Sequence, residues 1–223
     1  MSRTKLMDRE MPAYTRTEEK INMITHIVGG GIAVAALVLC IIRSAIHHSG
    51  VGIGSSIVFG VSMILLYTMS SIYHGLPDGR GKRVMQILDH CSVYILIAGS
   101  YTPVLLCGVA KEDPVAAWVI FGIVWGLAAI AIVLNSIELR KFKHISMVLY
   151  LLMGWTIIFK VPVLYRTMGV KGFMLILVGG ILYTIGAVLY NLGKKKPYMH
   201  SVFHVFVVAG SVCHILAILL FVL

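Results

Sequence analysis

The sequence has little charge and is especially poor in acidic residues. Only 13% of its 223 residues are charged, and 9 acidic side chains stand against 19 lysines and arginines, for a formal net charge of +10 at pH 7. Hydrophobic residues make up 59% of the chain. A soluble domain of this size does not need so much apolar surface, whereas a bundle of membrane-spanning helices does. The composition therefore argues against a soluble domain.

Paired cysteines and a cleavable signal sequence are also missing. The four cysteines, Cys40, Cys91, Cys107 and Cys213, lie in apolar stretches without CxxC spacing, so we interpret them as small core residues. The first 20 residues are polar and charged, and no small-residue cleavage site follows the first apolar run. We therefore expect the first apolar segment to remain as a membrane anchor.

Long polar stretches are absent after residue 20, because seven apolar segments fill the rest of the chain. They cover residues 21–42, 51–73, 85–107, 114–137, 145–165, 173–191 and 198–223. Each is near the roughly 20 residues that a helix needs to cross a bilayer. The breaks between them are too short for a soluble domain. We predict an all-α membrane protein, with a polar N-terminal tail (residues 1–20) and a seven-transmembrane helix bundle (residues 21–223).

The lysines and arginines are concentrated in alternate breaks between these segments. One set lies in the tail and in the loops after the second, fourth and sixth segments: Arg3, Lys5, Arg9, Arg16, Lys20, Arg80, Lys82, Arg83, Arg140, Lys141, Lys143, Lys194, Lys195 and Lys196. The loops on the opposite side hold Arg43, Lys111, Arg166 and Lys171. This bias predicts a cytoplasmic N-terminus and, with seven spans, a C-terminus outside. It also explains the net positive charge without a nucleic-acid partner.

Five polar residues are predicted to share one depth near the cytoplasmic face. His200 and His204 open the last segment and lie on one face of a helix, because they are four residues apart. His74 ends the second segment, with Ser70 one turn deeper, and Asp89 lies near the start of the third. The topology places all of them within about two turns of that face, at roughly 5.4 Å per turn.

Three imidazoles and a carboxylate at one level match the ligand chemistry of Zn²⁺. Three histidine ligands leave a fourth position open, as in catalytic zinc sites. Asp89 would orient a water or accept its proton, and Ser70 would donate a hydrogen bond to a substrate or to Asp89. The alternative is a set of interfacial side chains solvated by lipid headgroups. Ionisable groups inside membrane segments usually mark function, which favours the metal site.

The other histidines are weaker candidates. His26, four residues after Asn22, has a compatible depth and is a candidate for the surroundings of the metal. His90 points about 100° away from Asp89 around the helix, and His214 lies roughly 15 Å above His204, which is too far for the same site. His47, His48 and His144 belong to loops.

At these residues the sequence resembles the hemolysin III family, the bacterial branch of the progestin and adipoQ receptor superfamily, which is itself similar to the alkaline ceramidases. The matching stretches are EEKINMITH (18–26), SSIYH (70–74), LDHC (88–91), AGSYTP (98–103), MGW (153–155), GGILYTIG (179–186) and the pair His200 and His204. They span nearly the whole chain. The resemblance implies zinc held near the cytoplasmic face by the histidines that match His74, His200 and His204, with Asp89 and Ser70 beside the metal.

Three functions remain open from the sequence. The resemblance links the receptor and ceramidase branches to lipid amide hydrolysis, which favours a zinc-dependent hydrolase of a lipid amide or ester, with a membrane lipid or fatty-acyl substrate and Asp89 as base. The second is a non-catalytic, zinc-stabilised membrane sensor or homeostasis protein. The third is a cytolysin, disfavoured because seven permanent spans do not suit an exported pore-former. We expect a multi-pass protein of the inner or plasma membrane with no soluble partner.

Overall fold

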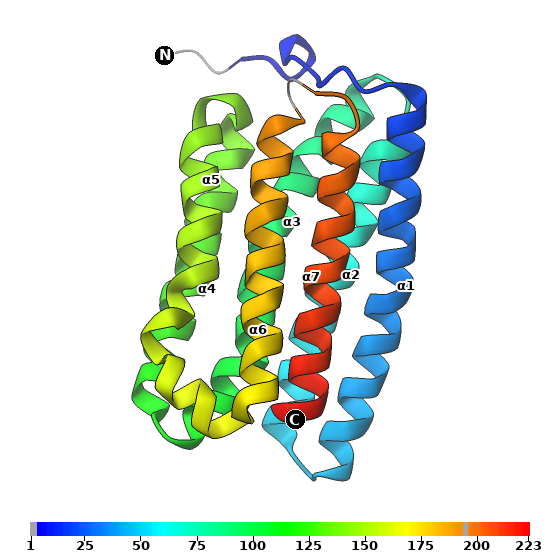
Figure 1. The fold of residues 1–223 in the computed structure, drawn as a ribbon. Coiled ribbons are helices and arrows are strands. Elements are labelled where there is room, and N and C mark those ends of the chain that lie inside the picture. Colours follow the sequence, from blue (N-terminus) through cyan, green and yellow to red (C-terminus); the bar gives the residue numbers. More distant parts are fainter. Residues whose placement is uncertain (1–3, 194–195) are drawn as a thin grey trace.

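The computed structural model describes residues 4–193 and 196–223, and within them the chain forms a bundle of seven α-helices (Figure 1). Arg3, Lys194 and Lys195, which contribute to the charge pattern, lie outside the described residues. The helices are α1 (Arg16–Ile46), α2 (Gly50–Gly75), α3 (Arg80–Pro103), α4 (Pro114–Ile137), α5 (Leu139–Trp155), α6 (Val161–Leu192) and α7 (Met199–Phe221). Short helical turns lie at Leu6–Asp8, Val104–Gly108, Val109–Lys111 and Thr156–Lys160. The predicted all-α class is confirmed.

Six helical stretches of the described chain are long and apolar enough to cross a membrane, which makes this a multi-pass membrane protein by helix composition. One of them, Leu139–Leu192, is 54 residues long. A straight helix of that length would be more than twice as long as the roughly 30 Å bilayer core is thick. The chain instead turns back between Thr156 and Gly169, so that α5 and the part of α6 after Gly169 run in opposite directions (Figure 1).

The structure divides the predicted segment 145–165 between two helices. α5 ends at Trp155, and α6 begins at Val161 with a proline in its first turn. α6 is then kinked at Gly169, which has a φ of 66°, a backbone angle that residues other than glycine rarely adopt. Three of the five residues in the turn are apolar (Ile157, Ile158 and Phe159), so hydropathy alone did not locate the break.

Side-chain caps determine where several helices begin. Thr15 and Glu18 form a reciprocal capping box at the start of α1, so the polar tail supplies the first turn of this helix. Ser49 accepts a hydrogen bond from Gly52 N–H at the start of α2. Asp113 caps α4 in the same way, immediately before Pro114.

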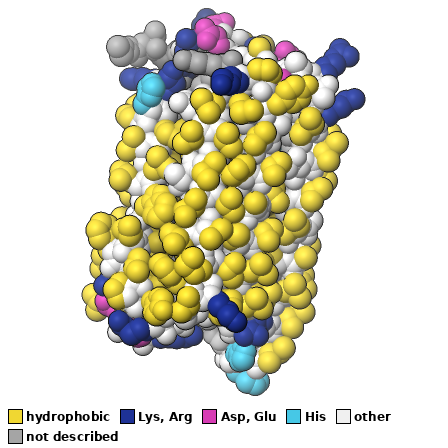
Figure 2. Space-filling view, viewed as in Figure 1, with side chains coloured by type: hydrophobic (Ala, Val, Ile, Leu, Met, Phe, Trp, Pro, Cys, Tyr) yellow, Lys and Arg dark blue, Asp and Glu magenta, His cyan; other side chains and the backbone are white. Residues whose placement is uncertain are grey.

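The bundle is apolar outside and partly polar inside. Hydrophobic side chains cover the middle of the visible face, whereas charged side chains lie at its two ends (Figure 2). Large apolar residues such as Trp118 and Phe159 are exposed on the surface. The buried polar residues include Asn22, His26, Ser70, His74, Gln86, Asn135, His200 and His204. This distribution suits a molecule surrounded by lipid along its middle and by water at its ends.

Small residues allow the helices that carry these polar groups to approach closely. A Cβ atom at Gly29 of α1 would lie 2.6 Å from Cε1 of Tyr67 on α2. A Cβ atom at Gly179 of α6 would lie 2.3 Å from Cδ2 of His214 on α7. Real Cβ atoms are not found so near another atom, so both contacts depend on glycine, as is common between membrane helices.

Candidate metal centre

Three histidines from two helices meet near one end of the bundle. His74 is the second-to-last residue of α2, and His200 and His204 lie in the first two turns of α7. All three are buried, and one ring nitrogen from each lies within 4.8 Å of those of the other two. The three predicted ligands, called the histidine trio below, therefore come together and could hold a metal ion.

The spacing and bonding of the trio fit a metal. Nε2 of His200 and Nε2 of His204 are 3.1 Å apart. Two nitrogens bound to one tetrahedral Zn²⁺ at about 2.0–2.1 Å are separated by about 3.3 Å, which is close to this distance. Nε2 of His74 is buried and has no hydrogen-bond partner in the described part of the chain. A cation would satisfy that nitrogen as well as the facing pair.

A carboxylate and an ammonium group stand behind His74. Oε2 of Glu19 lies 2.5 Å from Nδ1 of His74, and Oε1 of Glu19 accepts a hydrogen bond of 2.7 Å from Nζ of Lys82. The Lys82 ammonium also donates to the Leu76 carbonyl at 3.0 Å. Glu19 belongs to α1 and Lys82 to α3, so both neighbouring helices contact the end of α2. Sequence reasoning assigned neither residue to the site.

The inner face of α1 carries a polar stripe toward the trio. Glu19, Asn22 and His26 follow the spacing i, i+3 and i+7, which places them on one helix face. The ring of His26 stacks on that of His204 with centroids 3.8 Å apart. Nδ2 of Asn22, which is fully buried, lies 3.5 Å from Nδ1 of His74. This spacing is a signal in the sequence that could have identified Glu19 and Asn22 as neighbours of the trio. Only His26 was predicted from the sequence in that role.

Tyr14 covers the trio from the end of the bundle. Its ring stacks on the ring of His200, with centroids 4.7 Å apart and an interplanar angle of 18°. Burial, and then the nearby Tyr73 hydroxyl, raise the pKa of the Tyr14 hydroxyl well above its usual value. Tyr14 is therefore a neutral aromatic cover over the histidines at physiological pH.

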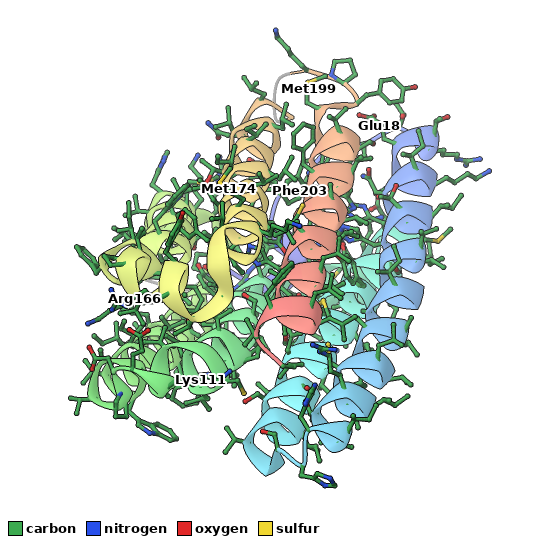
Figure 3. All side chains as sticks on the ribbon, turned by 60° about the horizontal axis from the view of Figure 1, so that its bottom comes forward. Glu18, Lys111, Arg166, Met174, Met199 and Phe203 are labelled. Atoms are coloured by element: carbon green, nitrogen blue, oxygen red, sulfur yellow. The ribbon has the colours of Figure 1, made fainter. Side chains whose placement is uncertain are left out.

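The capping carboxylate of α1 also holds the start of α7. Oε1 of Glu18 accepts a hydrogen bond of 2.7 Å from the backbone N–H of Tyr198. Tyr198 has a left-handed conformation with φ of 61°, and α7 begins at the next residue, Met199. Glu18 and Met199 accordingly lie at the same end of the bundle in Figure 3, opposite Lys111 and Arg166. This contact positions the first turn of α7, which contains His200.

A largely apolar cavity of about 160 Å³ extends into the bundle from two members of the trio, His200 and His204. Ser70 and Asp89 line its wall together with His200 and His204. The structure thus brings both predicted catalytic residues to the cavity that reaches the trio. Its other lining residues come mainly from α3, α5, α6 and α7 and include Leu96, Ile97, Leu151, Trp155, Ala187, Phe203 and Val207.

A second cavity of about 240 Å³ continues the first toward the other end. The two cavities share the lining residues Ser100, Tyr101, Gly154, Trp155, Gly180 and His214. The second is otherwise lined by apolar side chains, including Val104, Leu164 and Phe173. The trio therefore lies at one end of two adjoining apolar chambers.

The remaining histidines have other neighbours. Nδ1 of His90 lies 2.8 Å from the Gln86 carbonyl and its Nε2 lies 3.1 Å from the Tyr190 hydroxyl, so both ring nitrogens have partners, although His90 also borders the cavity. Nε2 of His214 lies 3.3 Å from the Ile176 carbonyl, deeper in the bundle and outside the trio. All four cysteines are free, and three of them are buried.

Comparisons with known proteins identify relatives of this chain. Residues 14–215 match the model of a family described as Haemolysin-III related. The chain is 37% identical to Hemolysin-3 of Bacillus cereus over 206 residues, which cover 92% of each chain. It is 39% identical to the Hemolysin-3 homolog of Bacillus subtilis (strain 168) over 208 residues, or 93% of this chain and 96% of that one. A more distant relative is the human Monocyte to macrophage differentiation factor, 24% identical over 72% of this chain and 67% of that protein.

Proposed function

Because the chain belongs to the haemolysin-III-related family, we propose that it is a zinc-binding membrane protein that hydrolyses an amide or ester bond of a membrane lipid. One observation carries the proposal: His200 and His204 of the buried histidine trio line an apolar cavity whose wall also carries Asp89 and Ser70. A metal-binding group, a carboxylate and a hydroxyl around one cavity are the components of a metal-assisted hydrolase.

Zinc is the proposed metal because the trio offers three nitrogen ligands and keeps a fourth position for the reaction. When bound, zinc polarises a carbonyl group and lowers the pKa of water toward about 7. Asp89 then serves as the general base that takes the proton of the attacking water. Ser70 donates a hydrogen bond to the substrate carbonyl or to Asp89, since a hydroxyl both donates and accepts.

The shape of the cavity supports a lipid substrate. The two chambers have mostly apolar walls and extend along the bundle, as required for the hydrocarbon chain of a fatty-acyl group. Tyr14 covers the trio at the end of the bundle, and at the same end Glu18 of α1 is hydrogen-bonded to the backbone N–H of Tyr198, just before α7. The substrate therefore reaches the metal through the cavity, with its chain in the chambers and its amide or ester carbonyl beside the trio.

We place the trio near the cytoplasmic face of the inner or plasma membrane, with seven spans and the C-terminus outside. α1 begins at the end that carries the trio, and the C-terminus lies at the other end (Figure 1). At that other end two basic residues are paired with acidic ones: Lys160 with Asp113 at 2.8 Å and Arg166 with Glu112 at 2.6 Å. The tail and loops at the trio end hold more lysines and arginines than those at the other end, which supports this orientation by the positive-inside rule.

A non-catalytic sensor or homeostasis protein is the second candidate, and the burial of the site favours it. The trio joins α2 to α7, and Tyr14 and Glu18 close the end above it, so a bound metal would also stabilise the helix arrangement. Cytolysis is suggested only by the names of the family and of the two Bacillus relatives. A bundle that buries its polar groups and exposes apolar side chains to lipid does not suit a secreted pore-former.

The test is an activity assay with the purified full-length protein in lipid nanodiscs. Ceramides and fatty-acyl amides and esters are supplied, first with zinc and then after removal of metal by a chelator. We expect release of free fatty acid from at least one lipid, loss of release without metal, and recovery when zinc is restored. Metal binding without cleavage of any of these lipids would contradict the hydrolase and favour the sensor.

A further inference from the structure

We propose that Glu19, held by Lys82, is a positioning residue that orients the ring of His74 and thereby determines how tightly the histidine trio retains its metal. The inference rests on the metal site of the proposed function and adds two residues to it. Neither is a ligand, and they lie on two helices, α1 and α3, that supply none of the three histidines.

The contact between Glu19 and His74 determines which nitrogen of His74 can bind a metal. A carboxylate only accepts hydrogen bonds, so the proton shared with Glu19 comes from Nδ1 of His74. The lone pair is then on Nε2, which is the buried nitrogen that lacks a partner in the described part of the chain. Carboxylates in this position fix the tautomer of metal-binding histidines and raise their basicity.

His74 needs such support because of its place in α2. It is the second-to-last residue of the helix, and the chain becomes extended at Leu76. Helix ends are held by fewer hydrogen bonds than helix centres. The Lys82 ammonium binds both the Glu19 carboxylate at 2.7 Å and the Leu76 carbonyl at 3.0 Å, so a single group restrains the ring and the backbone that follows it.

Lys82 also explains how a carboxylate is tolerated beside buried imidazoles. The side chain of Glu19 is 18% exposed and that of Lys82 is 7% exposed. A charge in such surroundings is unfavourable unless it is paired and hydrogen-bonded. Among the described residues, no other carboxylate forms a contact within 4.0 Å with a ring nitrogen of the trio. Within the trio, the contact with a carboxylate is therefore made by His74 alone among the described residues.

The experiment measures zinc retention by Glu19→Gln in full-length protein, by competition with a chelator of known affinity. The amide keeps the size of the side chain but loses its charge. We expect the dissociation constant for zinc to rise about 10- to 100-fold, as is typical when an outer partner of a ligand is changed. Co²⁺ in place of zinc should show altered visible absorption, which reports ligand geometry. Lys20→Gln, an exposed charge change one residue away on α1, is the control and should match the parent.

Lys82→Gln gives an independent measurement and a double-mutant cycle. Because Lys82 is proposed to act through Glu19, it should weaken zinc binding alone but add little to Glu19→Gln. Parental zinc affinity and Co²⁺ absorption in Glu19→Gln would overturn the inference. If Glu19→Gln does not fold, parental affinity in Lys82→Gln would overturn it instead. A parent protein that binds no zinc contradicts the proposed function itself, which separates the two failures.

Discussion

The neighbours of each histidine determine what its ring can do in this protein. One ring nitrogen from each histidine of the trio lies within 4.8 Å of the other two, whereas each nitrogen of His90 already has an oxygen partner. His214 borders the cavity, but its Nε2 lies near the backbone carbonyl of Ile176 and the residue is not part of the trio. Buried imidazoles are unfavourable in lipid unless they are partnered or functional. Residue type and depth alone therefore do not identify a ligand.

Metal content should distinguish these histidines. His200→Ala and His204→Ala each leave two ligands, so each variant should lose most of the zinc that the purified parent carries at about one ion per chain. His214→Ala should keep the parental amount, because it lies outside the trio. Elemental analysis of the purified variants measures the effect. Equal zinc in all three would contradict the assignment of the ligands.

Asp89 separates catalysis from metal binding. Asp89→Asn retains a hydrogen-bond acceptor but cannot take a proton at neutral pH. General-base catalysis contributes about 10²- to 10⁴-fold, so lipid cleavage should fall by that factor while zinc content stays near the parental value. Cleavage at the parental rate would exclude Asp89 as the base. Loss of zinc would identify Asp89 as a ligand and would contradict the catalytic interpretation.

At the level of helices, α5 and α6 form the part of the cavity wall where the two chambers meet. Gly154 on α5 and Gly180 on α6 line both chambers, and a Cβ atom at either position would have no other atom within 4 Å. These glycines therefore leave space open, unlike Gly29 and Gly179, which allow helices to touch. A larger side chain at Gly180 would therefore begin in open space at the cavity wall.

Gly180→Leu should consequently select against long acyl chains. If the leucine displaces two methylene groups of a chain, the loss is about 1.6 kcal/mol, or about 15-fold in kcat/KM. Short-chain substrates and zinc content should be unaffected. Gly126→Leu on α4 is the matched control, because Gly126 is exposed and a Cβ atom there also has open space. An equal loss for short and long chains would contradict an acyl chain in the chambers.

For the whole molecule, the unequal charge of the two ends predicts its orientation. Reporter fusions after Leu223 and within the loop of residues 80–83 should report opposite sides of the membrane, with the loop in the cytoplasm. The expectation follows from the larger number of lysines and arginines in the tail and loops at the trio end. Two reporters on the same side would contradict the seven-span topology.

The hydrophobicity and spacing of residues within single segments of the sequence determined the all-α membrane fold class and the positions of the polar groups near helix ends. Apolar length specifies helices that cross a bilayer, and each of His74, Asp89, His200 and His204 could be placed near a helix end because its distance from the neighbouring loop is a property of one segment. The end of α5 was not predictable in this way, because the turn Thr156–Lys160 is itself largely apolar, with Ile157, Ile158 and Phe159 at its centre.

Only the tertiary structure decided which polar groups touch. Glu19 and His74 are 55 residues apart, and Glu19 and Lys82 are 63 apart. Their contacts depend on how α1, α2 and α3 are rotated about their axes, and close packing at residues such as Gly29 sets that rotation. Sequence spacing describes one face of one helix. It carries no information about which face a neighbouring helix presents. Glu19, Lys82 and Tyr14 could therefore be assigned to the site only from the tertiary structure.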